Sequence, residues 1–496
     1  MGTLPANRSL LRPTHVRYGV LGFACSLSLL TYLDRICIMR AKENIQADLG
    51  FNDNMMGLVF SAFTLGYMLF EVPGGWMGDT WGARRVIARI VLCWSLFTAL
   101  TGAVWPFAFD SGRRLGWGGW SVPLVFDSLL LMLLVRFLFG LGEAGAYPNL
   151  TRVVGTWFPF QERAMAQGSI WMCARLGGAF APLIIGQLSV LLGWRQAFWV
   201  LGVAGVTWCV VFYRWFRDTP EEKPECNEAE RELIREGRPP GHSAGEGHAW
   251  PPLRQLVFSL TVWGLCGASC FVNFGWYFYP TWQPQYLKDV FGISFAGSEV
   301  LTGLPFLFGA IGSFIGGGLS DYLVRRTGSR RWGRSLIGAV GFTGAGLCVL
   351  CTGFAARPWQ AMALLCAAFL VNDLAIPVIW AASADVGGRF AGTVAGIMNM
   401  AGGIGAVLSP ALIPRVLGRL PQGWSPTERW RVVFAGLAFS WFLAAVSWLF
   451  IDASRPLFTS PEPASPPPEP PPYNNTSITA LPDREPSPVR PRNEGE

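Results

Sequence analysis

Six ionisable side chains lie inside long apolar runs of the chain, where an unpaired charge is unfavourable. They comprise three carboxyls and three guanidiniums: Asp34, Glu143 and Asp373, and Arg35, Arg136 and Arg175. An ionised group in mid-membrane must be paired or solvated, so each is a candidate functional residue. With all six ionised the set is close to neutral, and a bound carboxylate would then favour protonation of one carboxyl. We therefore expect the arginines to bind an anionic substrate and the carboxyls to carry protons.

Asp34 and Arg35 are neighbours within the run TYLDRICIM. Adjacent helix positions lie about 100° apart, so the two side chains diverge. Arg35 can then face a cavity while Asp34 finds another partner. The alternative is that both residues only mark the end of the helix, since Arg40 follows shortly afterwards.

Arg136, Gly140, Glu143 and Tyr147 are spaced so that one continuous helix would carry all four on a single stripe. Burial of Glu143 would favour its neutral form, which makes it a candidate proton carrier. Arg136 lies two turns away and would oppose that effect. The alternative is a structural Glu–Arg pair that joins two helices.

Other polar groups interrupt the later apolar runs. Arg175 lies within SIWMCARLGGAF, Asp373 within FLVNDLAIPV and Asn399 within GIMNMAGGIG. Asn273 and Tyr277, one turn apart, are candidates for a polar cavity face, although aromatics near helix ends more often form an interfacial belt. No histidine or acidic residue accompanies the closely spaced cysteines, so we expect no metal site.

The elements that must position these residues are apolar segments, since 51% of the 496 residues are hydrophobic and only 14% are charged. That composition excludes an ordinary soluble globule. Roughly 20 apolar residues span a bilayer as a helix. Twelve such segments are predicted: 17–38, 54–74, 85–106, 123–148, 162–190, 196–216, 254–284, 298–324, 334–356, 359–382, 389–416 and 430–451.

A glycine-rich charged hinge occurs twice, at positions about half the chain apart. Each copy has an aspartate followed by paired arginines: Asp79 with Arg84 and Arg85, and Asp321 with Arg325 and Arg326. A repeat at half-length indicates a duplicated membrane bundle. We expect these residues to form a gate in which the aspartate bonds a helix N-terminus or a cation. Glu71, just before Pro73, is expected to be a gate partner for an arginine.

The first hinge, GGWMGDTWGARR, resembles the loop motif between helices 2 and 3 of the major facilitator superfamily, and the second copy resembles its echo between helices 8 and 9. Further segments resemble the anion:cation symporter family, which includes hexuronate, glucarate and galactonate transporters and sialin-like carriers. The resemblance covers roughly residues 18–450. It is carried by TYLDR (31–35), SAFTLGYMLFEVPGG (61–75), Arg136 with Glu143 and Pro148, WFP (157–159), Trp282, Pro284 and LPF (304–306).

The resemblance implies an all-α polytopic membrane protein with twelve transmembrane helices in two six-helix halves. It implies that Arg35 binds a substrate carboxylate and that Asp34 and Glu143 are the proton-coupling pair. Tyr67, Asn399 and the polar face of segment 254–284 would line the cavity. The chain departs from the family at Glu71, where many members have glutamine, and also at Arg175, Asp373 and Gly403. An extra arginine would suit a substrate with two carboxylates, unless Arg175 pairs with Asp373 or Glu143.

The chain is expected to divide into four parts. They are a first six-helix half (1–216), a cytoplasmic linker (217–253) with a short helix near 227–236, a second half (254–452) and a disordered Pro-rich tail (453–496). Arginines crowd the N-terminus and the 84–89 and 325–334 turns, so both termini should be cytoplasmic. A bacterial inner membrane is the expected location.

These observations favour a monomeric secondary transporter in a lipid bilayer that imports a sugar acid or related organic anion by proton symport. No GxxxxGK[ST] loop is present, so coupling to ATP is not expected. No cofactor, nucleic-acid partner or enzymatic activity is expected either. The alternatives are an efflux antiporter for drugs or metabolites, and a receptor or scaffold that signals through the Pro-rich tail.

Overall fold

The computed structural model describes residues 12–117, 120–235, 250–293, 295–421 and 423–458. The predicted disordered tail therefore lies outside the described residues from position 459 onward. All the described elements belong to one unit, Met1–Thr459.

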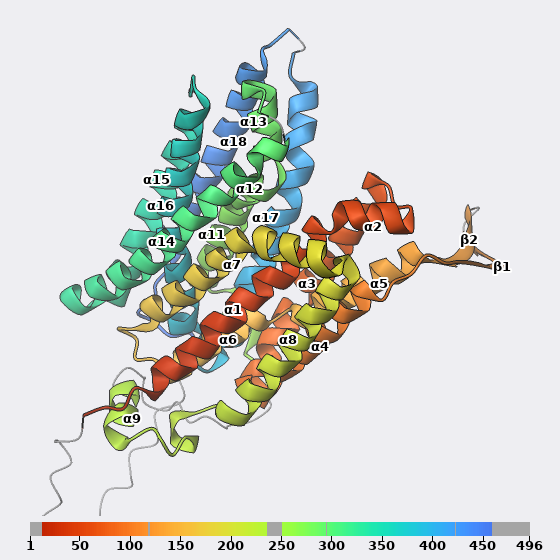
Figure 1. Cartoon of the computed structure of the whole chain (residues 1–496). Coiled ribbons are helices and arrows are strands. Elements are labelled where there is room, and N and C mark those ends of the chain that lie inside the picture. Colours follow the sequence, from red (N-terminus) through yellow and green to blue (C-terminus); the bar gives the residue numbers. More distant parts are fainter. Residues whose placement is uncertain (1–11, 118–119, 236–249, 294, 422, 459–496) are drawn as a thin grey trace, which may run out of the picture. The chain divides into compact units, whose positions relative to one another are not determined.

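The first half of the chain forms a helical group (Figure 1). Its long helices are α1 (Val16–Arg40), α3 (Asp53–Trp81), α4 (Ala83–Gly102), α5 (Ser128–Glu143), α6 (Ala146–Trp157), α7 (Arg163–Leu192) and α8 (Trp194–Trp215). The short α2 (Lys42–Leu49) follows α1. An antiparallel hairpin of β1 (Ala108–Trp117) and β2 (Trp120–Asp127) precedes α5. Between the halves come η2 (Pro220–Glu222), α9 (Glu228–Arg235) and α10 (Leu253–Val257).

The second half repeats the pattern. Its helices are α11 (Leu260–Trp276), α12 (Phe278–Thr281), α13 (Gln283–Phe291), α14 (Phe295–Thr327), α15 (Arg330–Thr352), α16 (Pro358–Gly387), α17 (Ala391–Arg419) and α18 (Pro426–Ser447). Single turns η3 (Gly388–Phe390) and η4 (Trp448–Phe450) follow α16 and α18. Among the described residues, ten helical stretches are long and apolar enough to cross a membrane. One of them, Pro358–Arg419, contains both α16 and α17, and α11 has only 17 residues, so twelve crossings are consistent with this count.

The predicted segment 123–148 is wrong at both ends. The hairpin continues to Asp127, whose side chain accepts a hydrogen bond from the Leu130 amide (2.8 Å) and caps α5. At the other end α5 stops at Glu143, because Gly145 has a φ of 84° and breaks the helix. Tyr147 therefore belongs to α6, and the predicted continuous stripe ends at Glu143.

The two halves meet chiefly through two pairs of helices, α3 with α17 and α7 with α14, and also through contacts of α6 with α16 and α17 and of α7 with α16. Glycines allow the backbones to touch at these contacts. A Cβ atom at Gly75 would overlap the carbonyl oxygen of Gly392, and one at Gly317 would overlap that of Ala164. The close approach of the halves therefore requires small residues at these positions.

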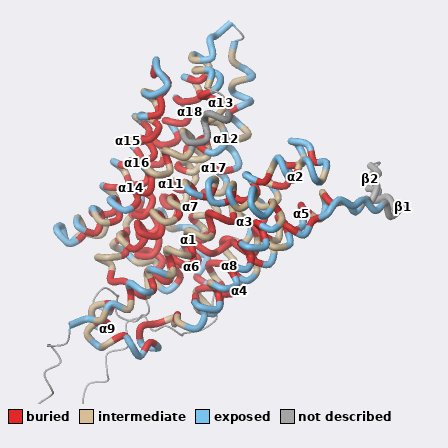
Figure 2. The backbone as a smooth tube through the Cα atoms, viewed as in Figure 1, coloured by how far each residue is buried: buried red, intermediate tan, exposed pale blue. Residues whose placement is uncertain are grey.

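Burial follows the expected pattern for helices in a bilayer (Figure 2). Large apolar side chains are exposed on the outward faces of α4 and α8: Leu92, Leu96, Val203, Val206 and Val210. Exposed apolar faces on the outside, with charges inside, suit a lipid surround rather than water.

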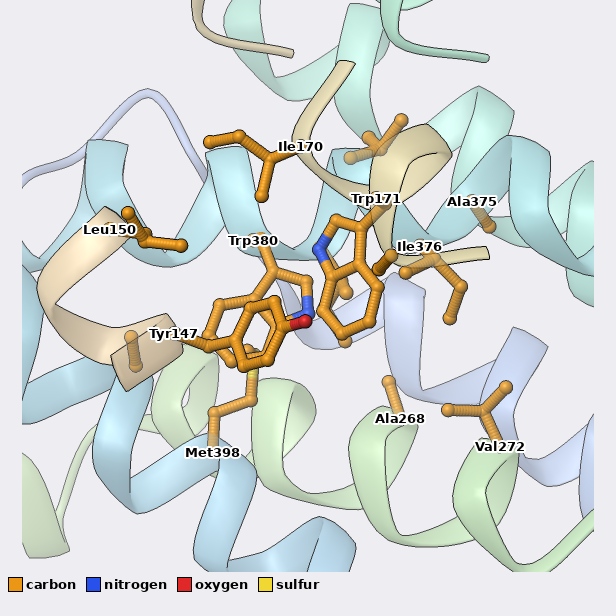
Figure 3. Close-up of a cluster of buried hydrophobic side chains, with 14 of the residues drawn as sticks. Tyr147, Leu150, Ile170, Trp171, Ala268, Val272, Ala375, Ile376, Trp380 and Met398 are labelled. Carbon is orange, nitrogen blue, oxygen red and sulfur yellow. The ribbon is translucent and has the colours of Figure 1, made fainter. Parts of the chain in front are cut away.

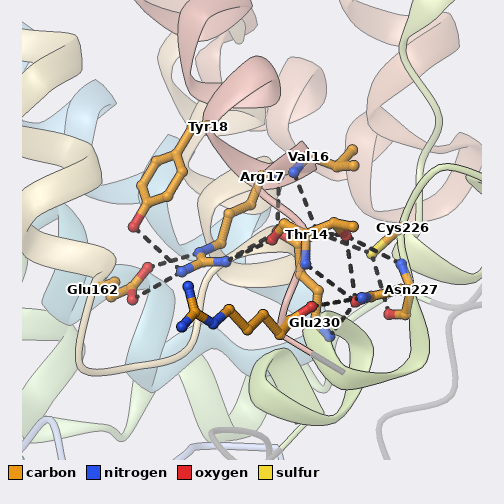
Figure 4. Close-up of polar contacts among 9 residues, drawn as sticks. Thr14, Val16, Arg17, Tyr18, Glu162, Cys226, Asn227 and Glu230 are labelled. Atoms are coloured by element: carbon orange, nitrogen blue, oxygen red, sulfur yellow. Dashed lines mark hydrogen bonds and ion pairs between the residues drawn. The ribbon is translucent and has the colours of Figure 1, made fainter. Parts of the chain in front are cut away.

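The helix α9 is fastened to the beginning of α1 by Glu230 (Figure 4). Its carboxylate accepts hydrogen bonds from the Thr14 hydroxyl (2.6 Å) and from the backbone amides of Val16 and Arg17 (3.2 Å each). The Arg17 guanidinium forms ion pairs with Glu230 (3.0 Å) and with Glu162 (3.0 Å), which precedes α7. Glu230 thus joins α9 to α1, and Arg17 extends the network to Glu162 before α7.

This network predicts an acid-sensitive contribution to stability. Burial opposes ionisation of Glu230, but the hydrogen bonds from Thr14, Arg17 and Val16 outweigh it and lower the pKa. A carboxyl whose pKa is lowered by folding stabilises the protein above its unfolded value of about 4.3. That stabilisation is lost as pH falls through the folded value.

We expect wild-type protein in detergent to lose more melting temperature than Glu230→Gln when the pH falls from about 6 to about 3, the range in which a lowered Glu pKa is crossed. The control is Glu232→Gln, an exposed residue on the same helix, which should behave like the wild type. Parallel melting curves for Glu230→Gln and the wild type would contradict the assignment.

Candidate substrate cavity and gate

A cavity of about 630 Å³ lies between the two halves. Its size is typical of a site for a small molecule. The lining includes all seven side chains predicted to bind substrate: Arg35, Tyr67, Arg136, Arg175, Asn273, Tyr277 and Asn399. These residues lie on six helices from both halves, and Tyr277 is at the C-terminal end of one of them, α11. They come together only when the two halves pack against each other.

Arg35 is held by Glu143 and by aromatic rings. Its Nε donates to Glu143 Oε1 at 2.6 Å, and its guanidinium lies 4.4 Å from the centre of the Tyr67 ring. Its Nη2 is buried and has no hydrogen-bond partner among the described residues. The cation is therefore positioned at the cavity wall with a donor available for an anionic oxygen.

Asp34 points away from the cavity lining and toward α5, as the divergence of adjacent helix positions predicts. It is buried, and the charged groups that act on it are Glu143 and Arg136. Arg136 is buried too, with its guanidinium 4.3 Å from the Phe139 ring centre and its Nε without a described partner. Asp34, Arg35, Arg136 and Glu143 thus form one cluster of alternating charge between α1 and α5.

Arg175 and Asp373 form a separate buried ion pair that bridges the halves. Arg175 Nε donates to Asp373 Oδ2 at 2.5 Å and Nη2 donates to Oδ1 at 3.1 Å. The pair is supported by Tyr32, whose hydroxyl accepts from Arg175 (3.1 Å), and by Asn372, which donates to Asp373 (2.8 Å). Of the two roles considered for Arg175, pairing with Asp373 is therefore the one present in this conformation.

The polar face of the second half is only partly engaged. Asn273 donates to the Ser269 carbonyl one turn earlier at 2.8 Å. Asn399 donates to the Tyr67 hydroxyl at 3.2 Å, which links α17 to α3 across the two halves. Tyr277 is the C-cap of α11 and also lines the cavity.

Three aromatic side chains of the cavity lining pack against one another (Figure 3). Tyr147 and Trp171 are stacked with ring centres 4.6 Å apart, and Trp380 packs against both at 5.8 and 5.5 Å. Tyr147 and Trp171 come from the first half and Trp380 from the second. Sequence reasoning missed Trp171 and Trp380. A tryptophan in an apolar helix can pack in the core or line a cavity, and the sequence pattern is the same in both cases.

Asp79 joins the two halves at one end of the interface. Its carboxylate accepts from the backbone amides of Gly392 (3.0 Å) and Thr393 (2.6 Å) at the start of α17, and from the Thr393 hydroxyl (2.7 Å). Arg152 of α6 completes the site at 3.0 Å. The carboxylate thus holds a helix N-terminus and a cation together.

Asp321 makes the equivalent contact in the second copy. It accepts from the amides of Ala164 (3.3 Å) and Met165 (2.7 Å) at the start of α7, and it pairs with Arg334 at 2.7 Å. Arg334 also bonds Asp385 (3.3 Å), which pairs in turn with Arg163 of the other half (2.7 Å). Sequence reasoning missed Arg152, Arg163 and Asp385 as members of these ion-pair networks, and it counted Arg334 only as part of a basic turn.

The four arginines predicted for the gate form no ion pair with either aspartate in the part of the chain that is described. Their contacts lie elsewhere: Arg84 with the Tyr213 carbonyl, Arg325 with the Gln161 carbonyl, Arg326 with the Tyr322 hydroxyl, and Arg85 exposed. The hinge repeat located the aspartates, but the cation of Asp79 comes from α6 and that of Asp321 from the start of α15.

The expectation for Glu71 is also wrong. It is completely buried, and neither carboxyl oxygen forms a hydrogen bond or ion pair with a described residue, so no arginine holds it. The polar side chains beside it are Tyr67 and Asn399.

Known proteins are similar to this chain in sequence. The family model described as Major Facilitator Superfamily matches residues 24–410. The probable sulfoacetate transporter SauU of Cupriavidus necator is 33% identical over 407 residues, which cover 81% of this chain and 88% of that protein. The probable galactarate/D-glucarate transporter GudP of Escherichia coli is 30% identical, covering 83% and 90%. The hexuronate transporter of Bacillus subtilis is 28% identical, covering 79% and 86%.

Solved structures agree on the fold. The proton:xylose symporter XylE superposes with a TM-score of 0.61 at 13% identity, covering 88% of this chain and 94% of that one. An inward-facing bacterial homologue of the lysosomal transporter Spinster gives a TM-score of 0.54 at 20% identity, covering 88% and 98%.

The relatives are named as transporters rather than enzymes, and the fold is that of a multi-pass membrane protein. The chain therefore belongs to the major facilitator superfamily, among its transporters of the anion:cation symporter type.

Proposed function

We propose that this transporter imports a sugar acid of the hexuronate or aldarate type, or a related organic anion, by proton symport through alternating access. The observation that carries the proposal is Arg35, a cation at the cavity wall that has one donor free and is held by Glu143. Relatives named for sulfoacetate, galactarate, glucarate and hexuronate support a carboxylate or sulfonate group on the substrate.

Coupling would follow from competition for Arg35. An ionised Glu143 satisfies the guanidinium, whereas a protonated Glu143 leaves it to an incoming anion. Binding of a proton would therefore favour binding of the anion, and binding of the anion would favour binding of the proton. Asp34 shares the same electrostatic cluster and would act with Glu143.

Alternating access would use the contacts at Asp79 and Asp321. Both join the halves at one end of the interface, the end where α1 and α7 begin. Arg17, which bonds Glu162, and Arg325, which bonds the Gln161 carbonyl, lie on this side. Together with the basic 84–89 and 325–334 turns they support a cytoplasmic position for both termini in a bacterial inner membrane. The conformation described would then be closed to the cytoplasm. We propose that the protein acts as a monomer.

The first test is binding. Purified protein in detergent should show a raised melting temperature with glucuronate, glucarate, galactarate or sulfoacetate, because a ligand that binds only the folded state stabilises it. Arg35→Ala should weaken that binding by about tenfold to hundredfold, since a hydrogen bond to a charged group contributes about 1.5–3 kcal/mol. Arg214→Ala, an exposed arginine at the end of α8, is the control. Unchanged binding in Arg35→Ala, or a response to lipophilic cations alone, would overturn the proposal.

The second test separates coupling from binding. In proteoliposomes, Glu143→Gln should abolish accumulation driven by an inward proton gradient while exchange of internal for external substrate continues. The reason is that a permanently neutral side chain still releases Arg35 but no longer carries a proton. Asp289→Asn, a carboxyl of α13 outside the cavity lining, is the matched control. Wild-type accumulation by Glu143→Gln would exclude this residue from coupling.

The third test concerns the gate. Asp79→Asn and Asp321→Asn each weaken charge-assisted bonds of about 1.5–3 kcal/mol, which is enough to shift a conformational equilibrium by tenfold or more. Spin labels at positions 85 and 326, in a background without native cysteines, should therefore report longer distances across the halves. Asp218→Asn is the control, because Asp218 accepts from the Arg84 amide at 2.8 Å and bonds no described residue of the second half. Unchanged distances in the gate variants would contradict the gate assignment.

A further inference from the structure

One buried carboxyl of the interface between the halves is not used by the mechanism above. Glu71 lies on α3 where that helix touches α17, and a Cβ atom at Gly396 would stand only 2.6 Å from the Glu71 carbonyl oxygen. Its side chain has no exposed surface, and neither of its carboxyl oxygens has a partner among the described residues. A buried acid without a donor is a site that still requires an explanation.

The surroundings of Glu71 favour its neutral form. The charged groups that act on it are Arg35 of α1 and Glu143 of α5, and these two are already paired with each other. From α17 it meets only the amide of Asn399, and from its own helix the hydroxyl of Tyr67. The Asn399 amide already donates to the Tyr67 hydroxyl at 3.2 Å, and Arg35 is paired with Glu143, so an ionised carboxylate here would be buried without a counter-charge of its own.

The cations of the remaining neighbouring helices are bound elsewhere. Arg152 of α6 is held by Asp79, two turns further along α3. Arg89 of α4 donates to the Met77 sulfur at 3.0 Å. Neither of these two guanidiniums is therefore directed at Glu71 in this conformation.

The position of Glu71 along α3 sets its access to water. Tyr67, Glu71, Gly75 and Asp79 follow one another at intervals of one turn and all face α17. Tyr67 lines the cavity, and Asp79 closes the opposite end. Glu71 thus lies inside the contact that must separate when the gate opens.

We propose that Glu71 is a further proton-carrying site of the transport cycle, loaded in the gate-closed conformation and discharged on the gate side when α3 and α17 separate. The proton taken up converts the carboxylate to the acid, and water on the gate side accepts it on discharge. The proposal rests on proton symport, and it adds one proton per cycle to those carried by Asp34 and Glu143. The additional positive charge suits import of a substrate with two negative charges.

The protonation state of Glu71 is measured by infrared spectroscopy on full-length protein without substrate. At neutral pH the difference between wild type and Glu71→Gln should contain the carbonyl absorption of one protonated carboxyl. The same difference taken in the Asp79→Asn background, where the gate is opened, should lose that absorption at the same pH. Glu71→Asp, which displaces the acid by one methylene, should shift the absorption, and Ser61→Ala, on an exposed part of α3, should leave it unchanged.

Transport provides the second readout, with D-glucarate as the probe in proteoliposomes at zero membrane potential. Removing one coupled proton should lower the accumulation ratio about tenfold for each pH unit of the gradient, since one proton crossing one pH unit is equivalent to a factor of ten. Binding of D-glucarate should be unchanged in Glu71→Gln.

The failures of the two proposals are distinguishable. A wild type that accumulates D-glucarate, with Glu71→Gln at the same ratio, overturns the role of Glu71 alone. Absence of the carboxyl absorption, or an absorption that does not change when the gate opens, overturns it as well. A wild type that accumulates no anion contradicts the proposed function, and the infrared result then decides whether Glu71 is protonated.

Discussion

The constraint on which this structure depends is that every charge placed among its apolar helices needs a counter-charge from another helix. Arg35 of α1 is neutralised by Glu143 of α5, and Arg175 of α7 by Asp373 of α16. Leaving one partner of such a pair alone is far more unfavourable than lacking both. The pairs therefore fix which helices lie side by side, and they also make the site responsive to any new charge. A substrate anion or a proton changes the balance of a whole cluster rather than of one residue.

The gate applies the same constraint to helix termini. Each aspartate of the repeated hinge belongs to one half and holds the first turn of a helix from the other half: Asp79 binds the start of α17 and Asp321 the start of α7. The unpaired amides of a helix N-terminus carry a partial positive charge that a carboxylate satisfies. Glycines beside each site let the backbones approach closely enough for this bond. The aspartate and the neighbouring glycines thus act together in one contact between the halves, and this contact occurs twice in the chain.

Much of this arrangement could be predicted from sequence because periodicity reports which face of a helix a residue occupies. Arg35, Tyr67 and Asn399 were expected at a central cavity, and they line it. The two hinge aspartates were expected to bond a helix N-terminus or a cation, and they bond both. The substrate and the proton path stay predictions.

The ion-pair partners of buried groups and the positions of helix breaks were harder to predict, for physical reasons. Arg152 reaches Asp79 from α6, and nothing in the local pattern around Asp79 points to it. Arg334 lies in the basic turn after Asp321, but sequence alone does not tell which of the arginines of that turn pairs with the aspartate. The break at Gly145 depends on a single positive φ within an otherwise helical run, so the sequence also suited an unbroken helix. Glu71 was expected to be a gate partner for an arginine, yet Arg35 pairs with Glu143 and Arg152 with Asp79, and no described arginine bonds its carboxyl.

The bridge between Arg175 and Asp373 has a mechanical consequence. It joins α7 to α16 beside the cavity, with two hydrogen bonds that fix both position and orientation. Any rigid-body rotation of the two halves that preserves this bridge must use it as the pivot. The separation at each end of the interface would then grow with distance from the bridge. A small tilt of the helices at the level of Arg175 would become a wide opening at the membrane surface.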